Sequence, residues 1–169
     1  MLNAASIIRL LDMKPLTIEG GFFRETYRSP AEFDFPLYRG PRSLATAIYY
    51  LLTPDTFSRM HRVPGEEIFH FYLGDPVEMI QLASGKQGEV IVMGHELAAG
   101  MKVQHVVSGG AWQGARLQKG GSFALMGTTM SPGFDYSDYE TPDVNALVGE
   151  WPDFATLVRS LTPEQAGIN

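Results

Sequence analysis

Residues 61–76, "HRVPGEEIFHFYLGDP", decide the fold of this chain and hold two of its four histidines beside two adjacent glutamates. A Pro-Gly pair separates the end of one expected strand from the start of the next. In the second strand, residues 66–74, alternate side chains share a face. Glu67 and Phe69 therefore face one side and His70 the other. The stretch predicts two antiparallel strands with a glutamate directed to the inner side.

Segments of the same kind occur before and after this stretch. They are rich in β-branched and aromatic residues, and 18 glycines and 11 prolines supply turn signals. Short strands at such regular spacing indicate an all-β sandwich or barrel. Short helices are expected at the two ends, over 3–13 and 152–161. The strands are predicted at 20–29, 43–53, 55–63, 66–74, 77–83, 89–94, 104–108, 112–118 and 122–130.

Length and composition restrict the classes of function. A chain of 169 residues predicts one domain over 1–169, with the β-body over about 18–140. A net charge of −6 without a basic patch argues against nucleic-acid binding. No apolar run reaches the ~18 residues of a membrane span. The absence of cysteine excludes disulfides and cysteine-ligated metals, and favours a cytoplasmic location.

Two spaced motifs in the chain resemble those of the cupins. In the first cupin motif, His-x-His is followed by a glutamate and, after six intervening residues, a glycine; here Glu67 and Gly74 match. His61 falls at the first histidine position, and Val63 replaces the second. In the second motif, Pro-x-Gly-x-x-His, the chain has "SGGAWQ" at 108–113. A glutamine, Gln113, thus replaces the last histidine.

Longer phrases resemble one cupin family, DUF985 or cupin-5. The resemblance implies an all-β jelly-roll barrel, the cupin double-stranded β-helix, with short flanking N- and C-terminal helices. It also implies a relationship to deoxysugar epimerases and a homodimer, but no agreed activity. The matching phrases are "EGGFFRETYRS" (19–29), "TAIYYLL" (46–52), "SRMHR" (58–62), "EEIFHFYLGDP" (66–76), "GAWQGA" (110–115) and "PGFDYSDYE" (132–140).

One interpretation is a metal-dependent cupin enzyme. Metal-binding cupins use three histidines and a glutamate, and imidazole and carboxylate suit first-row cations. In this chain the resemblance gives His61, Glu67 and Gln113 as metal ligands, with Val63 in the fourth position. An amide and a hydrocarbon in place of two histidines weaken this set. No cofactor is firmly implied, and a divalent metal is the alternative left open.

A second interpretation is acid–base chemistry without a metal, as in the sugar epimerases of this fold. His61 would be the base and Glu67 the group that orients it. Arg59 lies two residues before His61 on the same strand, so the two are expected to share a face. Arg59 or Arg24 would hold an anionic group. This is the favoured function: a small-molecule-binding cupin with epimerase- or isomerase-like catalysis.

The third interpretation is a ligand-binding protein without turnover. Aromatic residues could line a barrel pocket closed by the 132–140 segment, which is otherwise a solvated acidic loop. Only one of the two alternating sets of side chains in residues 20–29 can face inward, and the sequence does not decide which one. If Arg24 faces inward, it favours an anionic ligand; if Glu25 does, a cationic or hydroxyl-rich one is favoured. The partner is expected to be a small polar or anionic molecule. The predicted ligand-binding residues are Arg24, Tyr27, Tyr49, Phe69, Gln113 and Phe134.

Overall fold

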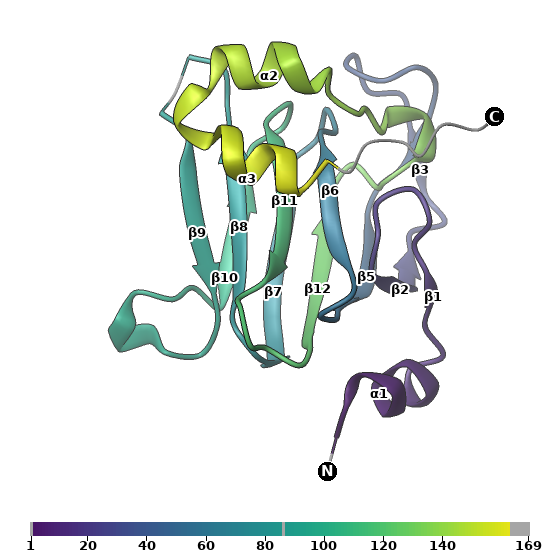
Figure 1. The fold of residues 1–169 in the computed structure, drawn as a ribbon. Coiled ribbons are helices and arrows are strands. Elements are labelled where there is room, and N and C mark those ends of the chain that lie inside the picture. Colours follow the sequence, from purple (N-terminus) through teal and green to yellow (C-terminus); the bar gives the residue numbers. More distant parts are fainter. Residues whose placement is uncertain (1, 86, 163–169) are drawn as a thin grey trace, which may run out of the picture.

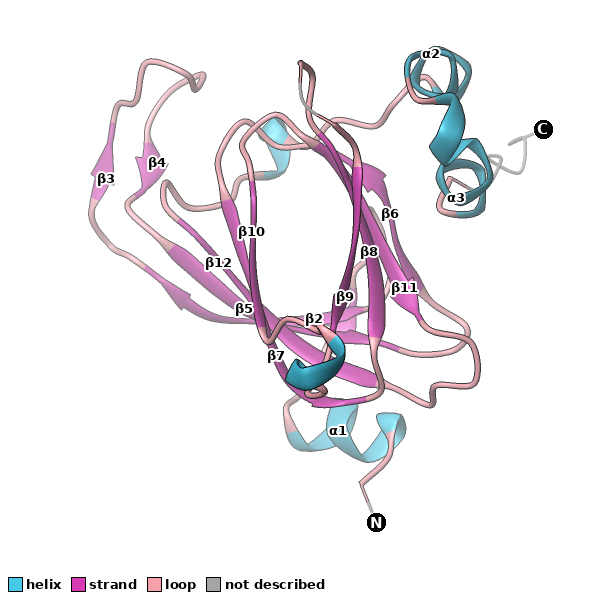
Figure 2. Cartoon of the chain, turned by 90° about the vertical axis from the view of Figure 1, so that its left-hand side faces the viewer, coloured by secondary structure: helices cyan, strands magenta, loops and turns pink. Residues whose placement is uncertain are grey.

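Two antiparallel sheets form the opposite walls of a barrel (Figure 2). The computed structural model describes residues 2–85 and 87–162. Nine longer strands match the nine predicted segments, so the predicted all-β jelly-roll fold is confirmed. They are β2 (Phe22–Arg28), β5 (Thr46–Leu52), β6 (Phe57–His61), β7 (Glu67–Gly74), β8 (Val77–Leu82), β9 (Glu89–Met93), β10 (Gln104–Val107), β11 (Trp112–Leu117) and β12 (Ala124–Met130).

Three two-residue strands were not predicted. The first, β1 (Lys14–Pro15), extends the larger sheet, whose order is β1-β2-β5-β12-β7-β10. The smaller sheet has the order β6-β11-β8-β9. The other two short strands, β3 (Glu32–Phe33) and β4 (Arg42–Ser43), pair only with each other and form an arm beside the barrel (Figure 2).

Short helices flank the barrel at both ends of the chain (Figure 1). Asn3 caps α1 (Ala4–Leu10) through a reciprocal pair of hydrogen bonds with Ser6. Near the C-terminus, α2 and α3 lie across the outer face of the smaller sheet, where Met60 and Ile80 pack against them. None of the described helices is both long and apolar enough to cross a membrane. The C-terminal bounds are α2 (Val144–Glu150) and α3 (Ala155–Ser160), and the 3₁₀ turns are η1 (Leu97–Ala99), η2 (Tyr136–Asp138) and η3 (Pro152–Phe154).

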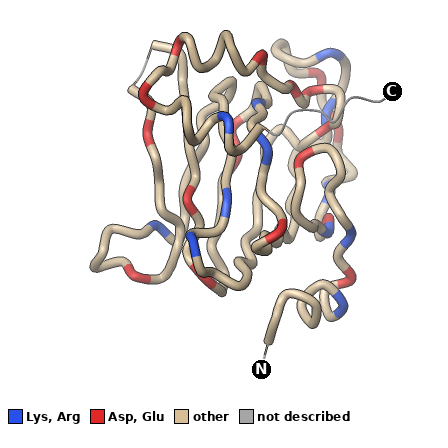
Figure 3. The backbone as a smooth tube through the Cα atoms, in the orientation of Figure 1, with Lys and Arg blue, Asp and Glu red and all other residues tan. Residues whose placement is uncertain are grey.

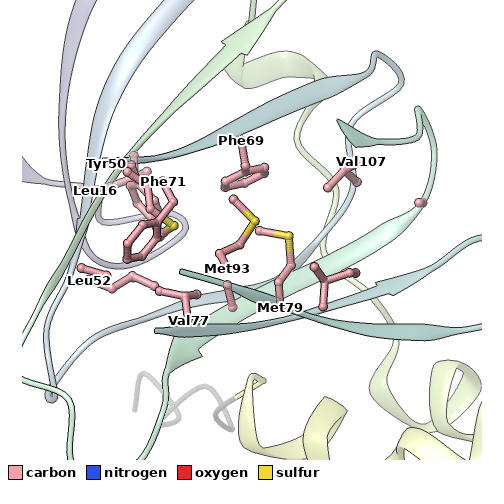
Figure 4. Packing of buried hydrophobic residues seen from close by; sticks show 14 residues of the cluster. Leu16, Tyr50, Leu52, Phe69, Phe71, Val77, Met79, Met93 and Val107 are labelled. Carbon is pink, nitrogen blue, oxygen red and sulfur yellow. The ribbon is translucent and has the colours of Figure 1, made fainter. Parts of the chain in front are cut away.

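The main hydrophobic core fills one part of the barrel interior. Phe69 from the larger sheet points toward Met79 and Met93 of the smaller one (Figure 4). Alternate residues of each strand enter this core, as the period of two requires. Burying these side chains supplies the main driving force for closing the two sheets together. The interior beyond this core carries polar groups, and it is there that the chain offers a site.

Candidate functional site

A cavity lies inside the barrel, where β2, β5, β7 and β12 face the end of β6. The cavity has a volume of about 70 Å³, which is room for roughly five to seven water molecules. Much of its wall is apolar, with contributions from Phe23, Ile48, Val63 and Phe134. The titratable residues that line it are Glu19, Glu25, Arg28, His61, Glu67 and Tyr136.

His61 is fixed by its own backbone and by a neighbouring ring. It is 2% exposed, and its Nδ1 lies 2.7 Å from the carbonyl oxygen of Arg59. Because a carbonyl can only accept, Nδ1 carries the hydrogen, and Nε2 of the neutral ring is left as an acceptor. The ring of Tyr139 stacks on the imidazole with centroids 4.8 Å apart. The histidine is therefore held in the tautomer that a general base requires.

Glu67 faces the same cavity, and its carboxyl has a raised pKa. Burial raises the pKa of Glu67, and the negative charge of Glu19 raises it further, against opposing effects of His61 and of hydrogen bonds. Nε2 of Gln113 donates to the Glu67 carboxylate at 2.9 Å. Glu67 and Gln113 are thus paired with each other inside the barrel. The expected role of Glu67 in orienting His61 is taken by the Arg59 carbonyl.

Glu19 belongs to the cavity wall and was missed by the sequence interpretation. The Ser58 hydroxyl donates to its carboxylate at 2.6 Å. Two glycines at positive φ follow it, Gly20 at 110° and Gly21 at 71°. A Cβ on Gly20 would collide with the carbonyl oxygen of Phe57. The "EGG" at 19–21 was itself the available signal, since a glycine pair marks a tight turn that can direct the preceding side chain.

A bulge in β2 decides which of its side chains face the cavity. The pairing of β2 with β5 shifts register between Glu25 and Tyr27. Glu25 faces inward, which settles the alternative left open by the sequence. Beyond the bulge the alternation reverses, so Arg28 lines the cavity and Tyr27 is exposed. Arg24 faces away and pairs with Asp12 at 2.8 Å, so its predicted place in the pocket is wrong.

A second bulge explains the position of Arg59. Between Ser58 and His61, β6 has two residues opposite the single Gly114 of β11. The strict alternation that would place Arg59 and His61 on one face is therefore broken. The Arg59 side chain is exposed and lies 3.3 Å from the carbonyl oxygen of Thr17. Its guanidinium does not line the cavity, so the predicted role of Arg59 in holding an anionic group is wrong. Arg59 instead contacts His61 through its backbone carbonyl oxygen.

The remaining predicted site residues divide between the cavity and other places. Phe134 lines the cavity, together with Tyr136, as expected for a closing segment. Phe69 is buried in the hydrophobic core instead. Tyr49 packs on the outer side of the larger sheet, with its ring edge-on to Tyr72 at 6.1 Å. The inward tyrosine of this strand is its neighbour Tyr50, whose hydroxyl donates to the carbonyl of Gly20 at 3.0 Å.

The predicted metal set does not fit these positions. Among residues 2–85 and 87–162, no three His, Cys, Asp or Glu side chains are grouped closely enough to hold a metal ion. Gln113 directs its amide nitrogen, not an oxygen, toward Glu67. The Nδ1 atom of His61 is engaged by a carbonyl, and Val63 occupies the wall beside it. A first-row metal prefers three imidazole or carboxylate ligands, and this arrangement offers two.

Comparison with known proteins defines the class of protein. The model of the Cupin superfamily (DUF985) family matches residues 5–142, and the chain belongs to this family. The resemblance seen in the sequence is thus confirmed. Solved cupins of lower similarity share the fold alone.

Three relatives are more similar to this chain, and their descriptions name no activity. The chain is 31% identical over 134 residues to the uncharacterized protein YML079W of Saccharomyces cerevisiae, covering 72% of this chain and 66% of that protein. A hypothetical protein from Leishmania major aligns with a TM-score of 0.88 at 26% identity, covering 96% of this chain and 100% of that one. Protein SO0799 of Shewanella oneidensis aligns with a TM-score of 0.85 at 31% identity, covering 96% and 99%.

Proposed function

We propose that this cupin binds a small polar molecule in the cavity and moves protons on it without a metal, as an isomerase or epimerase does. One observation carries the proposal: Nε2 of His61 is a free acceptor, and Glu67 holds a proton more tightly than an ordinary glutamate. Both groups face the same cavity. An acceptor nitrogen and a carboxyl with a raised pKa in one cavity are the arrangement expected of an acid–base pair.

The two groups act in sequence on one substrate. Nε2 of His61 removes a proton from a carbon next to a carbonyl, and the electron pair moves onto the carbonyl oxygen. If Glu67 then delivers its proton to the opposite face of the same carbon, the electron pair returns from the oxygen and the product is the epimer. If Glu67 instead protonates the former carbonyl carbon, the hydroxyl proton of the first carbon moves to the former carbonyl oxygen, a new carbonyl forms at the first carbon, and the product is the isomer. Transfer of the proton from the imidazolium to the carboxylate restores the starting state.

Deuterium incorporation tests this function before the natural substrate is known. The protein would be incubated in D₂O with a panel of aldoses and ketoses, and exchange at carbon would be followed by NMR. His61→Asn keeps a donor for the Arg59 carbonyl but removes the Nε2 base. We expect it to lower exchange by roughly 100-fold or more. His70→Gln is the matched control, because His70 lies on the outer face of β7 and hydrogen bonds to Thr129 and Gln104.

Loss of exchange in both histidine variants, or in neither, would contradict the assignment of the base. A second variant, Glu67→Gln, separates the roles of the two groups. It retains an acceptor for Gln113 and loses the proton. In this variant His61 should still remove the carbon-bound proton, so deuterium exchange should persist. Conversion to the isomer or epimer, which needs the proton of Glu67, should fall.

We further propose that the protein is a homodimer in the cytoplasm. The outer face of the larger sheet supports the dimer, because Tyr27, Tyr72 and Val106 are exposed on it while α2 and α3 cover only the other sheet. A second copy of the chain is the partner that the family resemblance implies. Sedimentation equilibrium of the wild type and of Tyr72→Lys checks this. The wild type should have twice the monomer mass, and the variant should already dissociate at protein concentrations at which the wild type is still a dimer.

A further inference from the structure

The charges that line the cavity are mostly negative. Glu19, Glu25 and Glu67 contribute three carboxyl groups, and Arg28 is the cation among the lining residues. His61 is neutral when Nε2 is free to act as a base. Even without Glu67, which carries a proton in the proposed function, the carboxylates of Glu19 and Glu25 outnumber the one cation, Arg28, and the wall is net negative. Such a wall repels a phosphate or carboxylate group and accepts hydrogen bonds from hydroxyl or ammonium groups.

Arg28 is already occupied by protein groups. Its Nη2 and Nε lie 2.7 and 3.1 Å from the Glu25 carboxylate, a two-pronged contact. The same Nη2 donates to the carbonyl oxygen of Phe134 at 3.1 Å. The bulge makes this pair possible, because it brings residues three apart in one strand to the same face. Glu25 thus neutralises the charge of Arg28 and occupies its Nε and Nη2 edge, so an anionic ligand would have to compete with Glu25 for the guanidinium.

Other arginines around the barrel are engaged away from the cavity. Arg24 pairs with Asp12 and Arg42 with Asp138, while Arg62 pairs with Glu140. None of these arginines, nor Arg59, lines the cavity. Figure 3 shows basic and acidic residues interspersed along the described chain, with no basic cluster at one place. No described cation other than Arg28 is therefore placed to hold an anion in this cavity.

We propose that the cavity selects a neutral or cationic ligand that bears hydroxyl or amine groups, and that Glu25 determines this selectivity by holding Arg28. This inference rests on the proposed function, namely that the cavity binds a small molecule. Hydroxyl or amine hydrogens of the ligand donate to Glu19 and Glu67, and its carbon-bound hydrogens face Phe23 and Phe134. The enclosed space admits roughly five to seven non-hydrogen atoms. A ligand clamped by Arg24 or Arg59 through an anionic group is no longer the expectation.

A charge-sorted fragment screen tests the selectivity without knowledge of the ligand. Fragments matched in size would be divided equally into anionic, neutral hydroxylated and cationic sets, and binding followed by ligand-observed NMR. Ile48→Trp and Met130→Trp place an indole in the cavity. Only fragments whose binding is lost in a folded blocking variant are counted as cavity ligands.

We expect cavity ligands from the neutral and cationic sets to outnumber the anionic ones at least fivefold. Equal numbers, or an excess of anions, would overturn the selectivity and leave small-molecule binding intact. If no fragment depends on the cavity, the proposed function fails and this inference fails with it. The two failures are therefore distinguishable.

Charge variants then test the role of Glu25. Glu25→Gln releases Arg28, so the affinity for the best anionic fragment should rise about tenfold while that for neutral fragments stays unchanged. Arg28→Gln should have the opposite effect, tighter binding of cations. Glu78→Gln is the matched control, because it alters an equivalent glutamate–arginine pair, with Arg116 at 2.8 Å, that does not line the cavity. Unchanged anion affinity in Glu25→Gln would overturn the role of Glu25.

Discussion

At Gly20, backbone geometry decides where a neighbouring carboxyl points. The residue has φ of 110°, and a Cβ there would meet the carbonyl oxygen of Phe57. A side chain at this position would both strain the backbone and push β6 away from the turn. Since Glu19 precedes this turn and Ser58 lies in β6, the contact between them depends on the glycine. The site is therefore built partly by a residue that has no side chain.

Gly20→Ala should destabilise the protein more than an alanine at a glycine with free space. Gly40 is the matched control, with φ of 87° and nothing within 4 Å of the added Cβ. We expect Gly40→Ala to lower the free energy of unfolding by about 1 to 2 kcal/mol and Gly20→Ala by at least about 3 kcal/mol. Urea denaturation measures both. Equal losses would contradict the close approach of Phe57.

The raised pKa of Glu67 makes a prediction about pH. The folded state holds this proton more tightly than the unfolded chain. The free energy of unfolding therefore falls as the pH rises from the ordinary pKa of glutamate to the raised one. Each unit of raised pKa corresponds to about 1.4 kcal/mol. Glu67→Gln, which resembles the protonated form, should remove this fall.

The measurement is urea denaturation at several pH values between about 4 and 8. This is roughly the range in which an ordinary glutamate and one with a raised pKa titrate. Glu66→Gln is the control, because Glu66 is the adjacent glutamate and is exposed. The stability difference between Glu67→Gln and wild type should grow with pH, whereas that of the control should stay constant. A constant difference in both variants would show that Glu67 titrates as an ordinary glutamate.

At the scale of elements, the segment from 131 to 140 is held over the cavity by arginines from three other parts of the chain. Arg28 contacts the carbonyl of Phe134, and Arg62 pairs with Glu140. Arg42 lies in β4 and binds both carboxylate oxygens of Asp138, with side chains only 6% and 10% exposed. The segment is thus a fixed part of the wall through its polar contacts.

Asp138→Asn should cost more stability than Glu140→Gln. Removing the charge of Asp138 leaves a buried guanidinium without its partner, at a cost of roughly 2 kcal/mol or more. The pair of Arg62 and Glu140 is exposed, so its loss should cost less than about 1 kcal/mol. Thermal unfolding compares the two variants under one condition. A larger loss in Glu140→Gln would mean that the buried pair does not anchor the segment.

The sequence predicted the strands well and their irregularities poorly. Alternation over seven to eight residues is a strong signal, and β5, β7 and β12 lie where it placed them. A bulge adds one residue to a strand without a distinctive residue type: Thr26 and Met60 give no sign of one. Yet the bulges moved Arg59 and Tyr27 out of the site and brought Arg28 in. The helix α2 was missed although its signals were present: Asp143 at the N-cap, and Val144, Leu147 and Val148 at helical spacing.

At the scale of the whole molecule, apolar packing stabilises the two sheets, with α2 and α3 on the outer face of the smaller one and Ile7 of α1 against Leu51 and Leu125 of the larger one. That the chain forms one domain over 1–169 stays a prediction. The family and the jelly-roll fold, by contrast, were predicted from the resemblance of several long phrases, such as 19–29 and 66–76, to those of the family.

Chelation should leave the stability of the whole protein unchanged. A ligand that binds only the folded state raises the melting temperature, so stripping a bound metal lowers it. We expect the melting temperature in EDTA to stay within about 1 °C of that in buffer, because in the proposed metal-free mechanism no bound ion stabilises the folded state. Metal content by plasma mass spectrometry after loading with manganese, iron, nickel or zinc is the companion measurement. A stoichiometric metal lost in His61→Asn would overturn the metal-free mechanism.

The bulge in β2 has a consequence for how this cavity could change its ligand during evolution. If β2 straightened without losing a residue, regular alternation would turn Tyr27 to the wall in place of Arg28. The cavity would lose its cation, and the Phe134 carbonyl its donor, in a single event. Deletion of Thr26 would instead remove the extra residue and keep Arg28 at the wall, so the presence of the bulge, and not the side chains alone, should decide which molecules related proteins accept.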